Sequence, residues 1–178
     1  MNQMSDSKKY PISPYFEIKS NHPWYIDAEI EELMHYSQNL KTVLQSITKN
    51  ENINKGWRDE DLETNVQLLL LIDYEELEVW KYPVDLSFGK LSLKEDVISF
   101  NENSRIALYF EDDQAVMRKL GYLPKEDTLQ AHNIMAELPN YKIATYLTGG
   151  PYKKLTFEDN ELEIDNGFEE FRLNILIY

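Results

Sequence analysis

Carboxylates are the most abundant side chains in this sequence that could do chemistry. The chain has 178 residues, of which 32 are acidic and 18 are basic. The acids gather in four clusters: Asp59, Glu60, Asp61 and Glu63; Asp73, Glu75, Glu76 and Glu78; Glu111, Asp112 and Asp113; and the acids between Glu158 and Asp165. Such groups can transfer protons, coordinate a hard cation or attract a basic partner.

The last of these clusters has an alternating pattern. The acids from Asp159 to Asp165 occupy every second position, but the glycine that a calcium loop requires follows two residues too late. On a strand, alternate residues project from one face, so the pattern predicts a row of like charge. If Asn166-Gly167 is a two-residue turn, Glu163 lies opposite Glu170, which costs up to about 1 kcal/mol. Such a surface suits a cationic partner, although a solvated sheet face in a slightly different register is the simpler explanation.

Acid density is highest beside large aromatic residues. Residues 51–100 hold twelve acids and five bases, half of the net charge of −14, together with Trp57, Tyr74, Trp80 and Tyr82. Acidic groups next to aromatic side chains can steer and then anchor a basic protein. We therefore expect a partner-binding surface that contains Asp73, Glu75, Glu76, Glu78, Trp80, Glu161, Glu163 and Glu170.

Other kinds of site find little support. The absence of cysteine excludes thiol catalysis, thiolate zinc sites and disulfides. The three histidines, His22, His35 and His132, lack metal-binding spacing, and no Gly-x-Ser-x-Gly motif is present. Gly149-Gly150 precedes Pro151, which removes a backbone donor that a phosphate loop would need. We expect no cofactor, no metal and no catalytic residue.

The N-terminal half must position these side chains through a mixture of helix and strand. Residues 1–14 are typical of a flexible arm, and Tyr15 to Lys19 fits a short edge strand. Apolar residues recur at three- and four-residue steps from Pro23 or Asp27 to Lys49, which predicts a helix. A second helix is expected from about Asp59, while residues 66–80 fit either helix or strand.

The second half favours strands with two short helices. Strands are expected at 86–93, 97–100 and 105–110, and helices at 112–120 and 126–138. In the last 38 residues, four runs of strand character are divided by Gly149-Gly150-Pro151, Asp159-Asn160 and Asn166-Gly167. These four runs predict an antiparallel meander.

The fold class follows from this order of elements. We expect an α+β protein: after the flexible arm at 1–14, residues 15–178 form a single domain with an N-terminal helix, several short helices and an antiparallel sheet that ends in the C-terminal meander. A length of 178 residues fits one domain, and 42% hydrophobic residues can build its core.

Net charge and hydropathy limit the partners. A pI near 4.6 is unsuited to phosphate binding, so direct contact with nucleic acid is not expected. The longest aliphatic run, Leu68 to Ile72, is far shorter than the roughly 20 residues of a membrane span. The polar N-terminus lacks the apolar stretch of a secretory signal, so a cytoplasmic location is expected.

Three functions fit these features. The favoured one is a non-catalytic acidic domain that binds a basic protein, in the manner of immunity or inhibitor proteins that block a toxin or nuclease. This comparison rests on composition alone. The first alternative is a carboxylate-dependent hydrolase, with or without a metal, that pairs Asp73 or Glu75 with Glu111 or Asp113. The second is a structural subunit of a larger assembly, in which the acidity serves only solubility.

Overall fold

The chain folds as an α+β protein built on two antiparallel sheets, which confirms the expected class. The computed structural model describes residues 14–48, 78–80, 86, 90–97, 104–158 and 161–178. Within them, the helices are α1 (Pro14–Asn21), α2 (Ser37–Thr48) and α4 (Thr128–Glu137), with 3-10 turns η1 (Leu33–Tyr36) and η2 (Lys125–Asp127). The strands are β1 (Ile26–Glu29), β2 (Glu78–Trp80), β3 (Lys90–Val97), β4 (Ser104–Glu111), β5 (Met117–Tyr122), β6 (Ile143–Glu158) and β7 (Glu161–Ile177).

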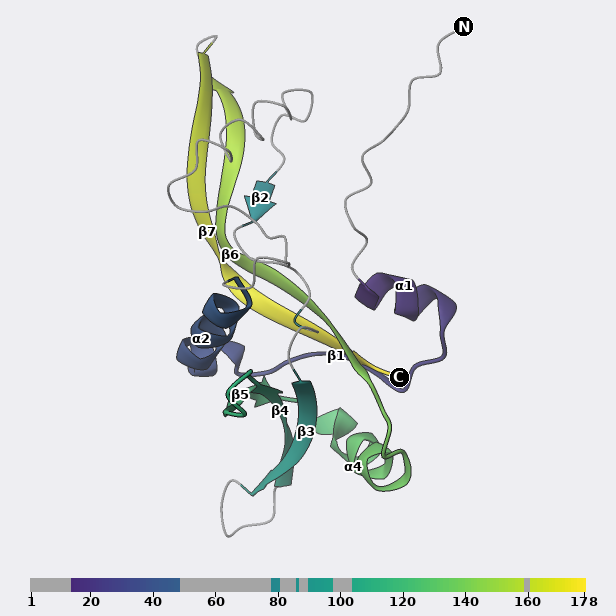
Figure 1. Ribbon diagram of the computed structural model, residues 1–178. Coiled ribbons are helices and arrows are strands. Elements are labelled where there is room, and N and C mark those ends of the chain that lie inside the picture. Colours follow the sequence, from purple (N-terminus) through teal and green to yellow (C-terminus); the bar gives the residue numbers. More distant parts are fainter. Residues whose placement is uncertain (1–13, 49–77, 81–85, 87–89, 98–103, 159–160) are drawn as a thin grey trace, which may run out of the picture.

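A long β6–β7 hairpin is the central feature of the larger sheet. Figure 1 shows the two strands as a twisted ribbon that extends well beyond the other elements. The strand order is β1-β7-β6-β2, and β6 pairs with β7 from Glu158 opposite Glu161 to Ile143 opposite Ile177. The expected C-terminal strands are therefore confirmed, but they form one hairpin that reverses between Glu158 and Glu161, and the four-run meander is wrong.

Two glycine signals that suggested turns lie inside these long strands. Gly149 has φ 87° at a shift of register in β6, and a Cβ on it would lie 2.2 Å from the carbonyl oxygen of Glu170. Gly167 pairs with Tyr152, whose ring would lie 2.1 Å from an added Cβ. A glycine in a strand can mark a bulge or a close approach as well as a turn. Here Gly149 lies at a bulge, and Gly167 lies where the ring of Tyr152 approaches closely.

The smaller sheet has the order β3-β4-β5. The expected strand at 105–110 is confirmed within β4, but the helix expected at 112–120 is wrong. Asp112 accepts hydrogen bonds from the backbone N–H groups of Gln114 and Val116, which closes a tight turn into β5. A local side-chain bond of this kind stabilises a turn as readily as a helix start.

The N-terminal region also differs from the prediction. Residues 14–21 form helix α1 in place of the expected edge strand, and the helix expected from Pro23 or Asp27 begins only at Ser37. Ile26, Ala28 and Ile30 are buried at alternate positions, which is the two-residue period of a strand. Ile30 also fits the three- and four-residue spacing that continues to Leu40, Val43 and Leu44. The sequence pattern therefore did not separate the strand from the helix that follows it. The expected helix at 126–138 is confirmed as η2 and α4.

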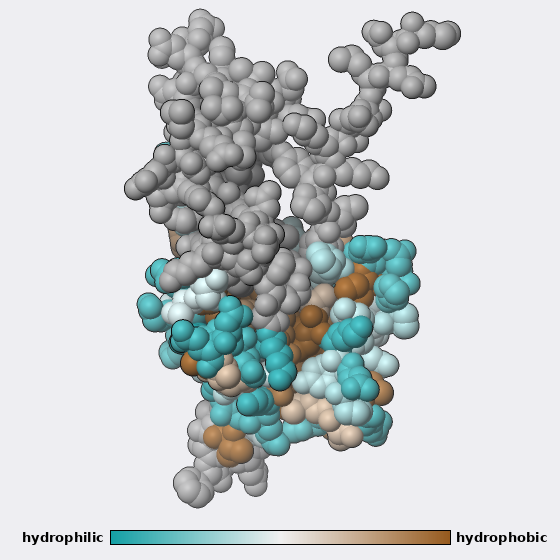
Figure 2. All heavy atoms as spheres, viewed as in Figure 1, coloured by the Kyte–Doolittle hydropathy of each residue, from teal (hydrophilic) through white to brown (hydrophobic). Residues whose placement is uncertain are grey.

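One large apolar cluster joins the two sheets. Its buried members come from both sheets and from helices α2 and α4, and include Leu44, Leu108, Ile134 and Leu173. A second, smaller cluster of Tyr15, Ala144 and Leu176 lies where α1 contacts β6 and β7. Figure 2 shows mostly hydrophilic residues on the described part of one face, with smaller hydrophobic patches among them. Among the described helices, none has the length and apolar character needed to cross a membrane.

Candidate functional site

The residues expected to bind a partner are only partly described. Asp73, Glu75 and Glu76 lie outside the described residues. Glu78 and Trp80 lie in β2, where they pair with Lys154 and Tyr152 of β6. The expected surface is therefore untested at its first three positions, and its β2 members lie on the edge strand of the larger sheet.

The remaining three residues all lie in β7. Glu161 lies opposite Glu158 and Glu163 opposite Thr156, so the predicted pair of Glu163 with Glu170 is wrong. The reason is the position of the chain reversal, which precedes Glu161 and leaves Asn166-Gly167 within the strand. Glu170 lies further along β7, beside a groove that the sequence did not predict.

This groove lies where β1 leaves β7 and has a volume of about 570 Å³, within the size range of ligand-binding pockets. We call it the glutamate groove. It is lined by Glu29, Ile30, Glu31, Glu32, Leu33, Met34, Pro124, Glu126, Glu170, Phe171 and Arg172. Five of these residues are glutamates, one is arginine and the other five are apolar. The groove thus combines a strongly acidic lining with an apolar one.

The path of the chain between the two sheets creates the groove. The Ile30 N–H donates to the carbonyl of Leu173 in the larger sheet, and the next residue, Glu31, exchanges two backbone hydrogen bonds with Tyr122 of β5. Glu32 then adopts a left-handed conformation with φ 61°, which is uncommon for a residue with a side chain. Residues 29–34 therefore bend away from β7 and leave open space beside residues 170–172.

Gly121 allows the two sheets to meet at this bend. Its φ is 154°, and a Cβ on it would lie 2.4 Å from the carbonyl oxygen of Glu31 and 2.5 Å from Cγ2 of Ile30. No side chain fits at that distance without displacing the backbone of Glu31. The glycine thus fixes how closely β5 approaches the acidic bend.

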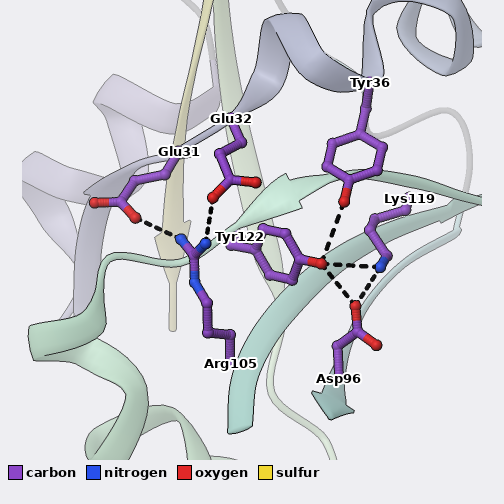
Figure 3. Close-up of polar contacts among 7 residues, drawn as sticks. All are labelled: Glu31, Glu32, Tyr36, Asp96, Arg105, Lys119 and Tyr122. Atoms are coloured by element: carbon purple, nitrogen blue, oxygen red, sulfur yellow. Dashed lines mark hydrogen bonds and ion pairs between the residues drawn. The ribbon is translucent and has the colours of Figure 1, made fainter. Parts of the chain in front are cut away.

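Arg105 of β4 forms ion pairs with two of the groove glutamates. Its guanidinium forms ion pairs with both Glu31 and Glu32, and its Cζ lies 4.2 Å from the ring centroid of Tyr122 (Figure 3). The Arg105 side chain is 10% exposed, whereas those of Glu31 and Glu32 are 47% and 46% exposed. A charge this buried needs close partners, and the two glutamates provide them.

The other three glutamates have no such partner. Glu29, Glu126 and Glu170 are exposed, and within the described residues none of them forms an ion pair or a side-chain hydrogen bond. Next to the groove, burial and then repulsion from Glu126 raise the pKa of Asp127 above its usual value. Among the described residues, the groove therefore presents three solvated carboxylates that no ion pair neutralises, which favours a negative potential there.

A polar network lies beside the Arg105 pair and joins three elements. Lys119 and the hydroxyl of Tyr122 both donate to Asp96, and the Tyr36 hydroxyl lies 3.2 Å from that of Tyr122 (Figure 3). The Lys119 ammonium also lies 5.0 Å from the ring centroid of Tyr122, 5.5 Å from that of Tyr36 and 5.9 Å from that of Tyr109. These rings stabilise the cation through their faces.

The three titratable groups of this network, Asp96, Lys119 and Tyr122, keep their protonation states near neutral pH. Hydrogen bonds from Lys119 and Tyr122 lower the pKa of Asp96. Burial alone would lower the pKa of Lys119, but its bonds to Asp96 and Tyr122 outweigh burial and raise it. Burial and the contact with Tyr36 raise the pKa of Tyr122 to about 12. A group that exchanges protons in catalysis needs a pKa near the working pH, so this arrangement suits a scaffold.

The acids proposed for hydrolysis are only partly described. Glu111 lies near Lys90, with 3.9 Å between the carboxylate and the ammonium, and Asp113 is exposed in the turn after β4. Their candidate partners, Asp73 and Glu75, lie outside the described residues, so the pairing stays a prediction. Among the described residues, no group of three or more acids or histidines could hold a metal ion.

Sequence reasoning identified only Glu170 of the groove. The helix predicted from Pro23 or Asp27 would place Glu29, Glu31 and Glu32 near its start, where the helix dipole favours acids. One available signal was the charge of that segment, because no lysine or arginine occurs between Lys19 and Lys41. The approach of Glu126 and Glu170 to this segment depends on the fold.

The groove's chemistry is the main guide to its role. No protein-family model matches the chain, and no curated protein or solved structure matches it either. The groove itself presents carboxylates for cations and an apolar lining for a hydrophobic group.

Proposed function

We propose that the protein is a non-catalytic binding domain whose glutamate groove receives a basic site on another protein. The observation that carries this proposal is the lining of the groove, in which five glutamates surround an apolar surface. The carboxylates attract a basic partner over a distance, and the apolar surface then supplies contact that does not depend on charge. A net charge of −14 strengthens the long-range attraction.

The scaffold under the groove supports a binding role. Arg105 holds Glu31 and Glu32 in fixed positions, and the Asp96–Lys119–Tyr122 network fixes the strands beside them. A preorganised surface loses less conformational entropy on association. The arrangement therefore favours recognition of a partner over chemistry on a substrate.

The narrower form of the proposal is an inhibitor or immunity protein. A toxin or nuclease that binds phosphate groups carries lysine and arginine residues around its site, and an acidic groove that pairs with them can keep the substrate out. The protein would then act on the toxin itself, without contacting nucleic acid, and we propose that the two meet in the cytoplasm.

The test is capture of a partner by the immobilised full-length chain at about 0.1 M salt, followed by elution at about 0.5 M salt, because exposed charge pairs weaken over that range. An unrelated acidic protein of similar net charge serves as the control bait. The captured protein is then purified and titrated against the chain by calorimetry at both salt concentrations.

The expected result is a basic protein that the control bait does not retain and whose affinity falls clearly at the higher salt. If that protein is an enzyme, one equivalent of the chain should suppress its activity. An affinity that is equal at both salt concentrations, or capture of only acidic proteins, would overturn the proposal.

A further inference from the structure

The five glutamates of the groove fall into two groups with different roles. Glu31 and Glu32 already share the guanidinium of Arg105. Glu29, Glu126 and Glu170 are exposed and have no ionic partner within the described part of the chain. Only the second group can pair with an incoming cation without competing against Arg105.

The three unpaired glutamates come from separate elements. Glu29 ends β1, Glu126 lies in η2 and Glu170 lies in β7. In the described residues no set of three acids is close enough to hold a single metal ion. Carboxylates spread in this way complement several separate cations better than one ion.

Apolar residues lie between these carboxylates. Ile30, Leu33 and Phe171 line the groove and are each only 4% exposed, so they form a fixed apolar floor. Met34 also lines the groove and is 38% exposed, and its flexible thioether side chain can adapt to an apolar group placed there. A ligand that carried cations alone would leave Met34 and the small exposed part of this floor uncovered.

We propose that the glutamate groove recognises a short extended segment of the partner in which an apolar side chain lies between lysine or arginine residues. The apolar side chain covers the floor, and the flanking cations reach Glu29, Glu126 and Glu170. This inference rests on the proposed function and adds to it the chemistry of the recognised segment and the residues that contact it.

The first test uses synthetic nonapeptides, labelled for fluorescence anisotropy and titrated into the full chain. One peptide carries Lys-Leu-Lys at its centre, a second carries Lys-Gly-Lys, and a third carries Glu-Leu-Glu. Spermidine is the competitor that supplies cations without an apolar side chain. We expect the Lys-Leu-Lys peptide to bind about tenfold more tightly than the Lys-Gly-Lys peptide, and the Glu-Leu-Glu peptide to show no binding.

The second test compares two triple variants of equal charge. One carries Glu29→Gln, Glu126→Gln and Glu170→Gln within the groove. The other carries substitutions of exposed acids elsewhere, namely Glu17→Gln, Asp113→Asn and Glu137→Gln. We expect the groove variant to lose about tenfold in affinity for the Lys-Leu-Lys peptide and the matched variant to stay within about twofold. Urea unfolding of both variants checks that the fold is intact.

Three outcomes would overturn the inference. They are equal loss of affinity in the two triple variants, equal binding of the Lys-Leu-Lys and Lys-Gly-Lys peptides, and displacement of the labelled peptide by spermidine at the same concentration as by unlabelled Lys-Leu-Lys peptide. Each leaves the proposed function standing if the wild-type chain still binds a basic protein in a salt-dependent way. Failure of the wild-type chain to bind any basic protein would instead remove the proposed function itself.

Discussion

The guanidinium of Arg105 lies over the ring of Tyr122, with its Cζ 4.2 Å from the ring centroid. The same guanidinium pairs with Glu31 and Glu32, and the backbone of Tyr122 bonds that of Glu31. The stacked pair therefore ties β4 and β5 of the smaller sheet to the bend that lines the groove. Cation–π contact and ion pairing both involve the Arg105 side chain, so its replacement removes both interactions at once.

Replacing Arg105 should destabilise the protein. We expect Arg105→Ala to lower the free energy of unfolding by about 3 kcal/mol, the lower end for a broken buried ion pair, because Glu31 and Glu32 remain nearly half exposed to water. Arg105→Lys should cost about half as much, since an ammonium keeps the charge but loses the planar, forked geometry. Urea unfolding measures both.

Arg172→Gln is the matched control for Arg105, because Arg172 is an exposed arginine of the same groove. Its effect on unfolding should stay within about 0.5 kcal/mol. Equal effects at the two positions would show that the Arg105 cluster contributes little to stability.

The elements with an uninterrupted pattern were predictable from the sequence. The strand at 105–110 is a short, mostly apolar run that ends at the acids 111–113, the helix at 126–138 ends before Pro139, and the structure confirms both. The 26–34 segment was not predictable, because its alternating apolar residues also fit a helix. Only tertiary pairing of Ile30 with Leu173 and of Glu31 with Tyr122 decides between the two.

The groove depends on contacts that local patterns do not encode. Arg105 lies more than 70 positions from the glutamates it holds. Gly149 and Gly167 gave the signal of turns, yet their lack of a side chain accommodates the backbone at Glu170 and the ring of Tyr152. A glycine shows that space is restricted at its position, but not which neighbour restricts it.

The Asp96 carboxylate should contribute stability that depends on pH. Its folded-state pKa lies below the usual 3.8, so the unfolded chain binds a proton more readily than the folded one as the pH falls. The contribution is therefore present above about pH 3.8 and is lost as the pH drops through the lower folded value. Asp96→Asn should cost about 1 kcal/mol at pH 7, in keeping with its partial exposure.

Urea unfolding at pH 7, 5 and 3 measures this effect. The difference between wild type and the Asp96→Asn variant should be similar at pH 7 and 5 and smaller at pH 3. Asp113→Asn, at an exposed carboxylate, should show little difference at any of the three. A difference for Asp96→Asn that persists unchanged at pH 3 would contradict the charge-based explanation.

Gly149→Ala should disturb the hairpin and the groove together. The added Cβ would lie 2.2 Å from the carbonyl oxygen of Glu170 and 2.9 Å from Cα of Phe171, and the backbone at Gly149 has φ 87°. We expect a loss of about 2 kcal/mol in the free energy of unfolding, from the strained conformation and the displaced strand. Amide chemical shifts at residues 170–172 should move as well. Alanine tolerated without a loss of stability would show that β7 shifts easily at this bulge.

Arg172 tests whether the charge of the groove controls association with a basic partner. It is the one cation among the described lining residues, and it is exposed, so its charge opposes the attraction that the glutamates exert. Arg172→Gln should therefore speed association with a basic partner by up to about fivefold, the equivalent of one exposed charge pair. Stopped-flow mixing at about 0.05 M and 0.5 M salt measures the effect, which should shrink at the higher salt as screening shortens the range of the charge.

Lys142→Gln, at an exposed lysine outside the groove lining, removes the same charge and should change the association rate less. A faster rate in both variants to the same degree would mean that net charge alone governs the encounter, and a slower rate in Arg172→Gln would mean that Arg172 itself contacts the partner.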